Sequence, residues 1–314
     1  MNLNYDKMTI LRIAKYYYLD GLSQQEIAVR ENIHRSLISR ILKLARESGY
    51  VQINIAIPDS YDTAILEKQL KEALGLRQVL IAPSLGQQPD QSEAFYFFAA
   101  RHLEKILPYS KNIGVGLGKT LYNVASQFTF QSPDPAPDFF SVAGSSGTDN
   151  SYLQNSVVLD SFARHFNGHC HYNNFSIYMH RDRMSQLDLN RFYELQKSYE
   201  KLDTVVLSIG GPVKIPNPYF EEFSLAAKEF LPVFTRPHGD LLGHIFYDNH
   251  ECYVLPDEYI ITSMSPQMLK KVPNVICIAS GSQKVHSIIS AANQKYFNIL
   301  ITDEATGKAI SQSI

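Results

Sequence analysis

One stretch, Asn112-Ile-Gly-Val-Gly-Leu-Gly-Lys-Thr-Leu-Tyr122, decides the fold of the larger part of this chain. Its first residues predict a buried strand that runs into a glycine-rich turn, and a helix is predicted to begin at Lys119. Backbone N–H groups at the start of a helix attract an anion, and glycine lets that anion approach closely. A lysine and a threonine add charge and a hydroxyl. The stretch therefore predicts a phosphate site in an α/β domain, made by Gly116, Gly118, Lys119 and Thr120.

Two well-known nucleotide motifs do not fit this stretch. A P-loop requires a glycine five residues before Gly118, where the chain has Ile113. A dinucleotide G-x-G-x-x-G motif that begins at Gly114 requires a glycine where Lys119 stands. Neither ATP nor NAD binding is therefore predicted, and we expect no cofactor. A sugar phosphate remains as the ligand, with the alternative that the glycines serve only close packing between strand and helix.

Strands and helices alternate on both sides of this stretch. Several expected strands are continuous apolar runs, which is typical of a parallel sheet buried on both faces. This pattern predicts a Rossmann-like α/β domain. The expected strands are 78–81, 112–117, 139–142, 204–209, 275–279 and 298–302, and the expected helices are 61–74, 91–106, 119–128, 152–166, 185–201 and 283–294.

Further loops of small residues follow other expected strands. In an open α/β sheet, ligands bind beyond the carboxyl ends of the strands, so these loops are expected to share one pocket. Asp240 and the 302–304 segment add carboxylates that could accept hydrogen bonds from sugar hydroxyl groups or cap helices. Beyond the first stretch, the candidate effector-binding residues are Gly144, Ser145, Ser146, Gly147, Gly210, Asp240, Gly281 and Lys284.

Residues 1–57 differ from the remainder in pattern and in charge. They hold eight Lys and Arg against five Asp and Glu, a net of +3, which leaves 21 against 26, a net of −5, for residues 58–314. Helices are expected at 6–18, 24–31 and 35–48, with Ser23 and Glu26 as a capping box, and a strand at 51–57. We therefore predict a winged helix-turn-helix DNA-binding domain at 1–57 and an effector-binding domain at 58–314.

The third of these helices has two distinct faces. At 100° per residue its apolar side chains occupy one face, and the opposite face carries serines, arginines and a lysine. Such a face fits the DNA major groove, although an ordinary surface helix has a similar pattern. His34, directly before this helix, caps it less well than Ser, Asp or Asn would. The candidate DNA-binding residues are Ser23, Gln24, Arg35, Ser36, Ser39, Arg40 and Lys43.

Composition limits the remaining possibilities. The chain has 314 residues, of which 45% are hydrophobic and 19% charged, as in an ordinary globular protein. It has no long apolar run and no signal-peptide pattern, and its three cysteines are far apart, so a reduced, cytoplasmic compartment is expected.

A metal site is suggested by one cluster of possible ligands, His165, His169, Cys170 and His171. However, Asn167-Gly168 interrupts the helical spacing of these histidines, and no metal is predicted.

With both parts considered, the chain resembles the SorC family of bacterial transcriptional regulators. The resemblance spans nearly the whole sequence. It rests on Ala14–Tyr17 with Gly21–Ala28, Ser39–Leu42 with Ala45-Arg46 and Gly49–Val51, Gly114–Thr120, Gly239–Gly243 with Phe246–Asp248, Gly281–Lys284 and Leu300–Glu304.

The resemblance implies a homotetrameric regulator of a carbohydrate operon, in which a phosphorylated sugar or sugar alcohol changes operator affinity. It also implies an effector domain similar to the glucosamine-6-phosphate and ribose-5-phosphate isomerases. Phosphate contacts would then fall on 118–120, 144–147 and Lys284, and sugar contacts on Asp240. In the deoxyribonucleoside regulator a lysine before the second glycine loop forms a Schiff base, but Ala143 stands here. Segment 169–180 is unusually polar and aromatic.

An active sugar-phosphate isomerase or deaminase with an accessory DNA-binding head is the alternative function. Isomerisation needs a positioned acid and base, and no Asp/Glu-x-His arrangement lies near a glycine loop. Gly243-His244-Ile245 resembles part of the deaminase signature but falls within the regulator-like run. We therefore predict a regulator that is not an enzyme.

Overall fold

The computed structural model describes residues 5–51, 61–84, 91–131, 133–145, 151–212, 239–246 and 257–314. The chain divides into two compact units, Met1–Pro58 and Asp59–Ile314. All but the first residue of the strand expected at 51–57 lies outside the described residues, as do the candidate residues Ser146 and Gly147.

The N-terminal unit is built from three helices, α1 (Lys7–Tyr18), α2 (Gln24–Glu31) and α3 (Arg35–Glu47). The capping box before α2 is present, because the Ser23 hydroxyl accepts from the Glu26 N–H while the Glu26 carboxylate accepts from the Ser23 N–H. Asn32 ends α2 in the left-handed conformation (φ 53°), which produces the tight turn into α3. A separate apolar core forms between the helices, from Ile10, Ile13, Ala14, Ile27, Ala28, Ile38, Ile41, Leu42 and Ala45.

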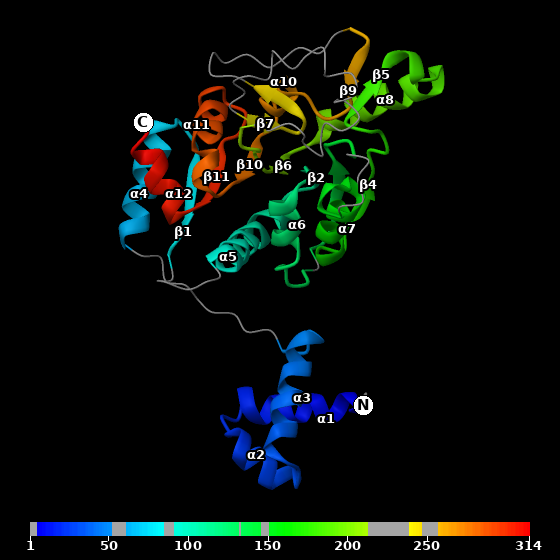
Figure 1. Ribbon diagram of the computed structural model, residues 1–314. Helices are drawn as coiled ribbons and strands as arrows, with labels where there is room; N and C mark the ends of the chain where they lie inside the picture. Colours follow the sequence, from blue (N-terminus) through cyan, green and yellow to red (C-terminus); the bar gives the residue numbers. More distant parts are fainter. Residues whose placement is uncertain are drawn as a thin grey trace. The chain divides into compact units, whose positions relative to one another are not determined.

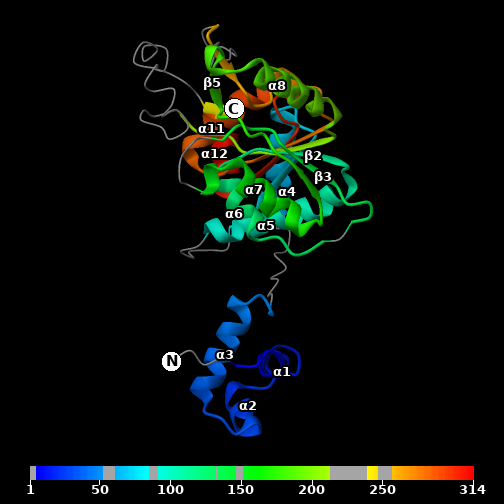
Figure 2. The same ribbon diagram turned by 90° about the vertical axis from the view of Figure 1, so that its right-hand side faces the viewer.

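The C-terminal unit contains a seven-stranded sheet in the order β1-β11-β10-β6-β2-β3-β4, and every neighbouring pair in it is parallel. Figures 1 and 2 show helices on both faces. The strands are β1 (Gln78–Ala82), β2 (Asn112–Val115), β3 (Asp138–Ser141), β4 (His169–His171), β6 (Thr204–Leu207), β10 (Asn274–Ile278) and β11 (Ile299–Asp303). The predicted α/β class with a parallel sheet is confirmed.

The helices differ from the expected ranges mainly at their ends. The segment expected to be helical at 119–128 ends at residue 125, and those at 152–166 and 185–201 divide into an α-helix and a short 3-10 turn. The helices are α4 (Tyr61–Ala73), α5 (Gln91–Ile106), α6 (Lys119–Ala125), α7 (Asn155–His165), α8 (Gln186–Ser198), α10 (Pro266–Leu269), α11 (Val285–Asn293) and α12 (Glu304–Ser311).

Alternating side chains of each strand enter two different core layers. On β10, for example, Val275 and Cys277 pack in the layer that contains α4, α11 and α12, whereas Ile276 and Ile278 pack in the layer that contains α5, α6 and α7. Strands that are apolar on both faces are therefore what this sheet requires. Gly114 of β2 is needed for the same close packing, because a Cβ there would lie 2.7 Å from Val142 Cγ1.

The order of the strands reverses next to β2. From β2 the chain proceeds outward through β3 to β4, and then returns to the other side of β2 and proceeds through β6 and β10 to β11. Such a reversal leaves a crevice beyond the carboxyl ends of the two strands, where ligands bind in open α/β sheets. The fold therefore places a candidate site after β2 and β6.

Two small antiparallel sheets lie beyond the main one. β7 (Gly239–Leu241) pairs with β8 (His244–Phe246), and β5 (Tyr178–His180) pairs with β9 (Tyr259–Ile261). The β7–β8 hairpin is held on the end of β6, because the Gly210 N–H donates to the Asp240 carbonyl at 3.0 Å. This contact brings Asp240 to the reversal point.

Candidate functional site

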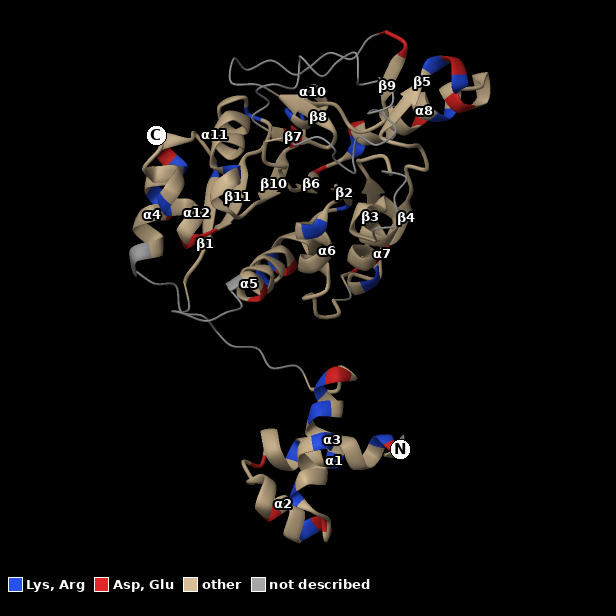
Figure 3. Cartoon of the chain, viewed as in Figure 1, with Lys and Arg blue, Asp and Glu red and all other residues tan. Residues whose placement is uncertain are grey.

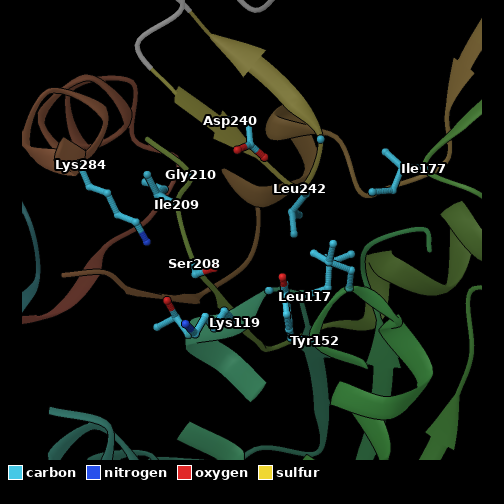
Figure 4. A pocket seen from close by; sticks show the side chains of 14 residues that line it. Leu117, Lys119, Tyr152, Ile177, Ser208, Ile209, Gly210, Asp240, Leu242 and Lys284 are labelled. Carbon is cyan, nitrogen blue, oxygen red and sulfur yellow. The ribbon is translucent and has the colours of Figure 1, made fainter. Parts of the chain in front are cut away.

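A cavity of about 330 Å³ lies at the reversal point of the sheet. Figure 4 shows Lys284 extending its amino group toward Ser208, and Asp240 lying across the cavity from Lys119 and Tyr152. Six of its lining residues are candidates from the sequence, namely Gly118, Lys119, Thr120, Gly210, Asp240 and Lys284. The other described residues that line it are Leu117, Tyr152, Leu153, Ile177, Ser208, Ile209, Leu242 and Gly243.

Asp240 is the acidic group of the cavity. Burial raises the pKa of its carboxyl to about 6, although a backbone hydrogen bond from Gly243 and the charge of Lys284 act in the opposite direction. Gly210 leaves the space that this carboxylate occupies, since a Cβ on Gly210 would lie 1.8 Å from Asp240 Oδ1. A carboxylate can accept more than one hydrogen bond, so Asp240 can accept hydrogen bonds from the hydroxyl groups of a ligand.

Lys284 is withdrawn from solvent at the beginning of α11. Its pKa is lowered because burial disfavours the ammonium form, while the nearby Cys277 and Asp240 favour that form. Cys277 lies on β10 with no exposed surface, and burial raises the pKa of its thiol to about 12. Lys284 and Asp240 thus provide two partly desolvated groups of opposite charge in one cavity.

The stretch 112–122 contributes the start of α6 to the cavity, but the N–H group of Gly118 is not available to a ligand. Gly118 precedes α6 with φ at 123°, a conformation that favours glycine, and its N–H donates to the Tyr152 carbonyl at 3.0 Å. The Gly118 N–H is therefore already occupied, so an anion would have to use the first amides of α6 and the side chains of Lys119 and Thr120. Lys119 is exposed, in contrast to Lys284.

Apolar side chains form a second wall of the cavity. Leu242 has a left-handed backbone (φ 54°), and Gly243 follows it at φ 83°. A non-glycine residue in this conformation is strained, which is a common property of ligand-binding turns. Gly116 lies behind this turn, because a Cβ there would be 3.0 Å from Leu242 Cδ2. Gly116, a candidate from the sequence, is not among the residues that line the cavity, and its lack of a Cβ provides room for Leu242.

The described part of the second glycine loop does not line the cavity. The Ser145 N–H donates to the Phe175 carbonyl, and its hydroxyl donates to Asn155 Oδ1 at 2.9 Å. A Cβ on Gly144 would lie 2.5 Å from Thr262 Oγ1. These two residues therefore join β3 to the segments beside it. Gly281 also lies outside the lining, and its N–H donates to Thr306 Oγ1 at 2.7 Å.

The candidate nucleic-acid surface of α3 has the two faces predicted for it. Ile38, Ile41, Leu42 and Ala45 are buried, and Figure 3 shows Lys and Arg positions, in blue, along the helix. Lys43 also forms an exposed ion pair with Glu47 at 3.6 Å. The exposed candidates on α3 are Arg35, Ser36, Ser39, Arg40 and Lys43.

The remaining candidate DNA-binding residues of the N-terminal unit, and His34, have different roles. Ser23 is exposed but uses its hydroxyl in the cap of α2, and Gln24 is half-buried. His34 makes no side-chain capping bond at the start of α3. It is exposed, so its ring is free to face solvent or a bound polyanion.

The histidine-rich segment contributes to packing at the edge strand β4. His171 Nε2 lies 2.8 Å from Asp138 Oδ1, and its ring stacks on Phe140 with centroids 4.3 Å apart. Within the described ranges, no group of three His, Cys, Asp or Glu side chains could hold a metal ion. The same ranges contain no helix that is long and apolar enough to cross a membrane.

Comparisons with known proteins agree with this arrangement. The model of the family described as "Putative sugar-binding domain" matches residues 60–311. The sorbitol operon regulator of Klebsiella pneumoniae is 25% identical over 311 residues, covering 97% of this chain and 98% of that protein. The deoxyribonucleoside regulator of Bacillus subtilis (strain 168) is 26% identical and covers 96% of each chain. The crystal structure of the full-length sorbitol operon regulator SorC from Klebsiella pneumoniae superposes with a TM-score of 0.71 at 24% identity, over 98% of this chain and 99% of that one.

Proposed function

The chain belongs to the sugar-binding domain family of the SorC-type regulators, and from this premise we propose that it is a DNA-binding transcriptional regulator of a carbohydrate-utilisation operon. The α3 surface binds the operator. A phosphorylated sugar or sugar alcohol binds in the cavity after β2 and β6 and changes the operator affinity. The protein acts in the cytoplasm as a homo-oligomer, with a tetramer as the expected state.

The convergence of Lys119, Lys284 and Asp240 on one cavity is the observation that supports this proposal best. Charge-assisted hydrogen bonds from two ammonium groups and from the first amides of α6 suit a phosphate. The Asp240 carboxylate suits the hydroxyl groups of a polyol. The apolar wall around Leu242 suits the carbon skeleton of the same ligand. An anionic carbohydrate is the ligand class that uses all three walls.

Control of DNA binding, rather than turnover, is the proposed role of this cavity. The cavity offers a carboxyl and an amine, but the relatives that cover nearly the whole chain are named as regulators. We therefore propose that the protein is not an isomerase or a deaminase. A steady-state assay with ribose-5-phosphate and glucosamine-6-phosphate is expected to show no turnover, and measurable turnover would favour the enzyme instead.

Titration calorimetry of the full chain tests the ligand class. We expect a phosphorylated sugar or sugar alcohol to bind at least tenfold more tightly than its dephosphorylated form, since charge-assisted hydrogen bonds contribute about 1.5–3 kcal/mol each. Equal affinity for both forms would place the anion site elsewhere. Because Ala143 has no amine, borohydride treatment of the complex is expected to trap no adduct at that position.

Gel shifts with the DNA upstream of the neighbouring operon test the regulatory part. The phosphorylated ligand identified by calorimetry is expected to change the operator affinity of the wild-type chain. The Gly210→Ala variant is the matched control, because its operator binding without ligand is expected to be unchanged. If the ligand binds without changing operator affinity, the cavity does not regulate DNA binding.

A further inference from the structure

Leu242 and Gly243 form the two-residue turn of the β7–β8 hairpin, because Leu241 before them pairs with His244 after them. Both turn residues have a positive φ, at 54° and 83°. Turns of this kind are usually made by Asn-Gly, Asp-Gly or Gly-Gly, since a larger side chain is strained in that conformation. Leu242 nevertheless occupies the first position and lines the cavity. A turn with this sequence needs support from outside the hairpin.

Tyr178, the first residue of β5, provides such support. Its hydroxyl donates a hydrogen bond to the Gly243 carbonyl, and its side chain is buried in the core of the C-terminal unit. The residue before it also packs against the turn, since a Cβ on Gly243 would lie 2.6 Å from Ile177 Cγ2. Ile177 lines the cavity, whereas Tyr178 is not among the described residues that do so. Tyr178 therefore acts on the cavity through the turn and not by contact with a ligand.

The segment that leads into β5 is itself held on two sides. The Ile177 N–H donates to the Ser145 carbonyl, and the Ile177 carbonyl accepts from the Thr262 N–H, both at 2.9 Å. Gly144 makes this approach possible, because a Cβ on it would lie 2.7 Å from the backbone nitrogen of Ile177. The described part of the second glycine loop thus fixes the strand that carries Tyr178, although it does not line the cavity.

The turn connects Tyr178 with Asp240. The Gly243 N–H donates to the Asp240 carboxylate, and the Gly243 carbonyl accepts from the Tyr178 hydroxyl. Both bonds involve the same turn residue, so a shift of Gly243 away from Tyr178 also weakens its bond to the carboxylate. We infer that Tyr178 is a positioning residue of the effector cavity, which holds the Leu242-Gly243 turn so that Asp240 is presented to the hydroxyl groups of the ligand. This inference rests on the proposed function and adds a residue to its cavity.

Loss of the Tyr178 hydroxyl has a defined electrostatic effect. The bond from the Gly243 N–H and the charge of Lys284 both lower the pKa of Asp240 against the larger effect of burial. The other titratable groups that face Asp240 among the described residues are Tyr178 from β5 and, across the cavity (Figure 4), Lys119 and Tyr152. Because Tyr178→Phe weakens the bond from Gly243, it is expected to raise the Asp240 pKa above its wild-type value of about 6.

Tyr178→Phe and Tyr199→Phe form a matched pair of variants in the full chain. Tyr199 is buried in the same core, and its hydroxyl donates to the Ser141 carbonyl at 2.9 Å, so each variant removes one buried hydroxyl from a backbone acceptor. An NMR titration of isotope-labelled aspartate carboxyl groups, with the Asp240 signal identified by its absence in Asp240→Asn, measures the Asp240 pKa without a ligand. We expect an upward shift in Tyr178→Phe and no shift in Tyr199→Phe.

Calorimetry with sorbitol 6-phosphate and with inorganic phosphate tests the effect on binding. Tyr178→Phe is expected to weaken sorbitol 6-phosphate about tenfold, because the hydrogen bonds to Asp240 are lost in part. Inorganic phosphate is expected to bind this variant as it binds the wild type, since its contacts are with α6 and the lysines. In the Asp240→Asn background, Tyr178→Phe is expected to cost less than about twofold, because two residues that act through one contact are not additive.

Three results would overturn the positioning role of Tyr178 and leave the proposed function in place. These are an unchanged Asp240 pKa in Tyr178→Phe, an equal shift in Tyr199→Phe, and additive losses of affinity in the double variant Tyr178→Phe/Asp240→Asn. If no phosphorylated sugar binds the wild-type chain, the ligand class of the proposed function fails instead. The NMR titration then decides the role of Tyr178 by itself.

Discussion

Charged side chains lie in opposite surroundings in the two units of this protein. On α3, Arg40 and Lys43 are exposed, and only the apolar face of the helix is buried. In the cavity, burial shifts the pKa values of both Asp240 and Lys284 toward the neutral forms. The first arrangement retains full hydration of the charges, whereas the second removes much of it before any ligand arrives.

This difference predicts two kinds of recognition. Exposed cations attract any polyanion, and their contribution decreases steeply as salt is added because counterions are released from DNA. Partly desolvated groups interact more strongly with a ligand that complements them, and they reject one that leaves them unpaired. We therefore expect operator binding to be far more salt-sensitive than effector binding. The variants below test whether the two sites differ in this way.

Gly210→Ala is expected to have the largest effect. The added Cβ would lie 1.8 Å from Asp240 Oδ1, so the carboxylate has to leave its position. We expect effector affinity, measured by calorimetry, to decrease about a hundredfold, since charged hydrogen bonds contribute about 1.5–3 kcal/mol each. Gly211→Ala is the control, because its Cβ meets the Gln283 carbonyl at 3.2 Å and needs only a small shift. Equal losses in both variants would show that general crowding, and not Asp240, is responsible.

The pH dependence of unfolding is expected to show the cost of burying the cavity charges. The pKa of Asp240 is raised from 3.8 to about 6 by burial, so its contribution to stability is present below about pH 4 and is lost as the pH rises through 6. His244 acts oppositely, because burial lowers its pKa from 6.5 to about 4, and its contribution is lost as the pH falls through that range.

Asp240→Asn separates these two contributions. In the variant, the free energy of unfolding is expected to rise more steeply between pH 4 and pH 6 than in the wild type, by about 2 kcal/mol over this interval. Urea unfolding at a series of pH values measures it. Parallel curves for the two proteins would mean that the Asp240 carboxyl is well hydrated, and the contrast between the two units would not hold.

Arg40→Ala tests the exposed cations of α3. An arginine contact to guanine or phosphate is worth about 1–3 kcal/mol, so operator affinity in gel shifts is expected to decrease tenfold or more. Ser39→Ala is expected to have a smaller effect in the same direction. Lys15→Ala, an exposed position on α1, provides the control. If a folded Arg40→Ala variant binds like the wild type, α3 is not the recognition helix.

Lys119→Ala is expected to have the smallest effect among these variants. Lys119 is exposed and well hydrated, so its contact with a phosphate should contribute less than that of the withdrawn Lys284. We expect calorimetry to show about a fivefold loss in affinity for the phosphorylated ligand. The preference over the free sugar should survive in part, because the amides of α6 remain. Lys111→Ala, at the opposite end of β2, should change nothing, and a loss there would indicate a non-specific charge effect.

Local patterns were sufficient to predict the three helices of the N-terminal unit and six of the seven strands of the main sheet. The bounds of α2 follow from Ser23 and Glu26, whose capping box depends only on neighbouring residues. The apolar runs at β6, β10 and β11 likewise predicted strands, because both faces of this sheet are covered. The sequence missed β4, a three-residue edge strand with the sequence His-Cys-His, because its residues are polar and partly exposed.

The cavity depended on contacts that no local pattern contains. Tyr152, Ile177 and Leu242 come from three separate segments and meet the helix start only through tertiary packing. The strand-end rule could have found Ser208, which follows β6 directly. That rule also included Gly144 and Ser145, which the fold uses for packing. Carboxyl ends of strands therefore locate a site, while the path of each loop decides which residues face it.

The small core between α1, α2 and α3 has a consequence for calorimetric melting of the protein. It consists of nine buried apolar side chains among the described residues of a unit of 58 residues. A unit of this size buries only about 60% of the surface of its unfolded chain, so its melting enthalpy is small compared with that of the sheet-containing unit. A heating scan followed by a single signal would therefore register mainly the larger unit. The temperature at which operator binding is lost can lie well below the main heat-absorption peak, and the two temperatures should be determined separately.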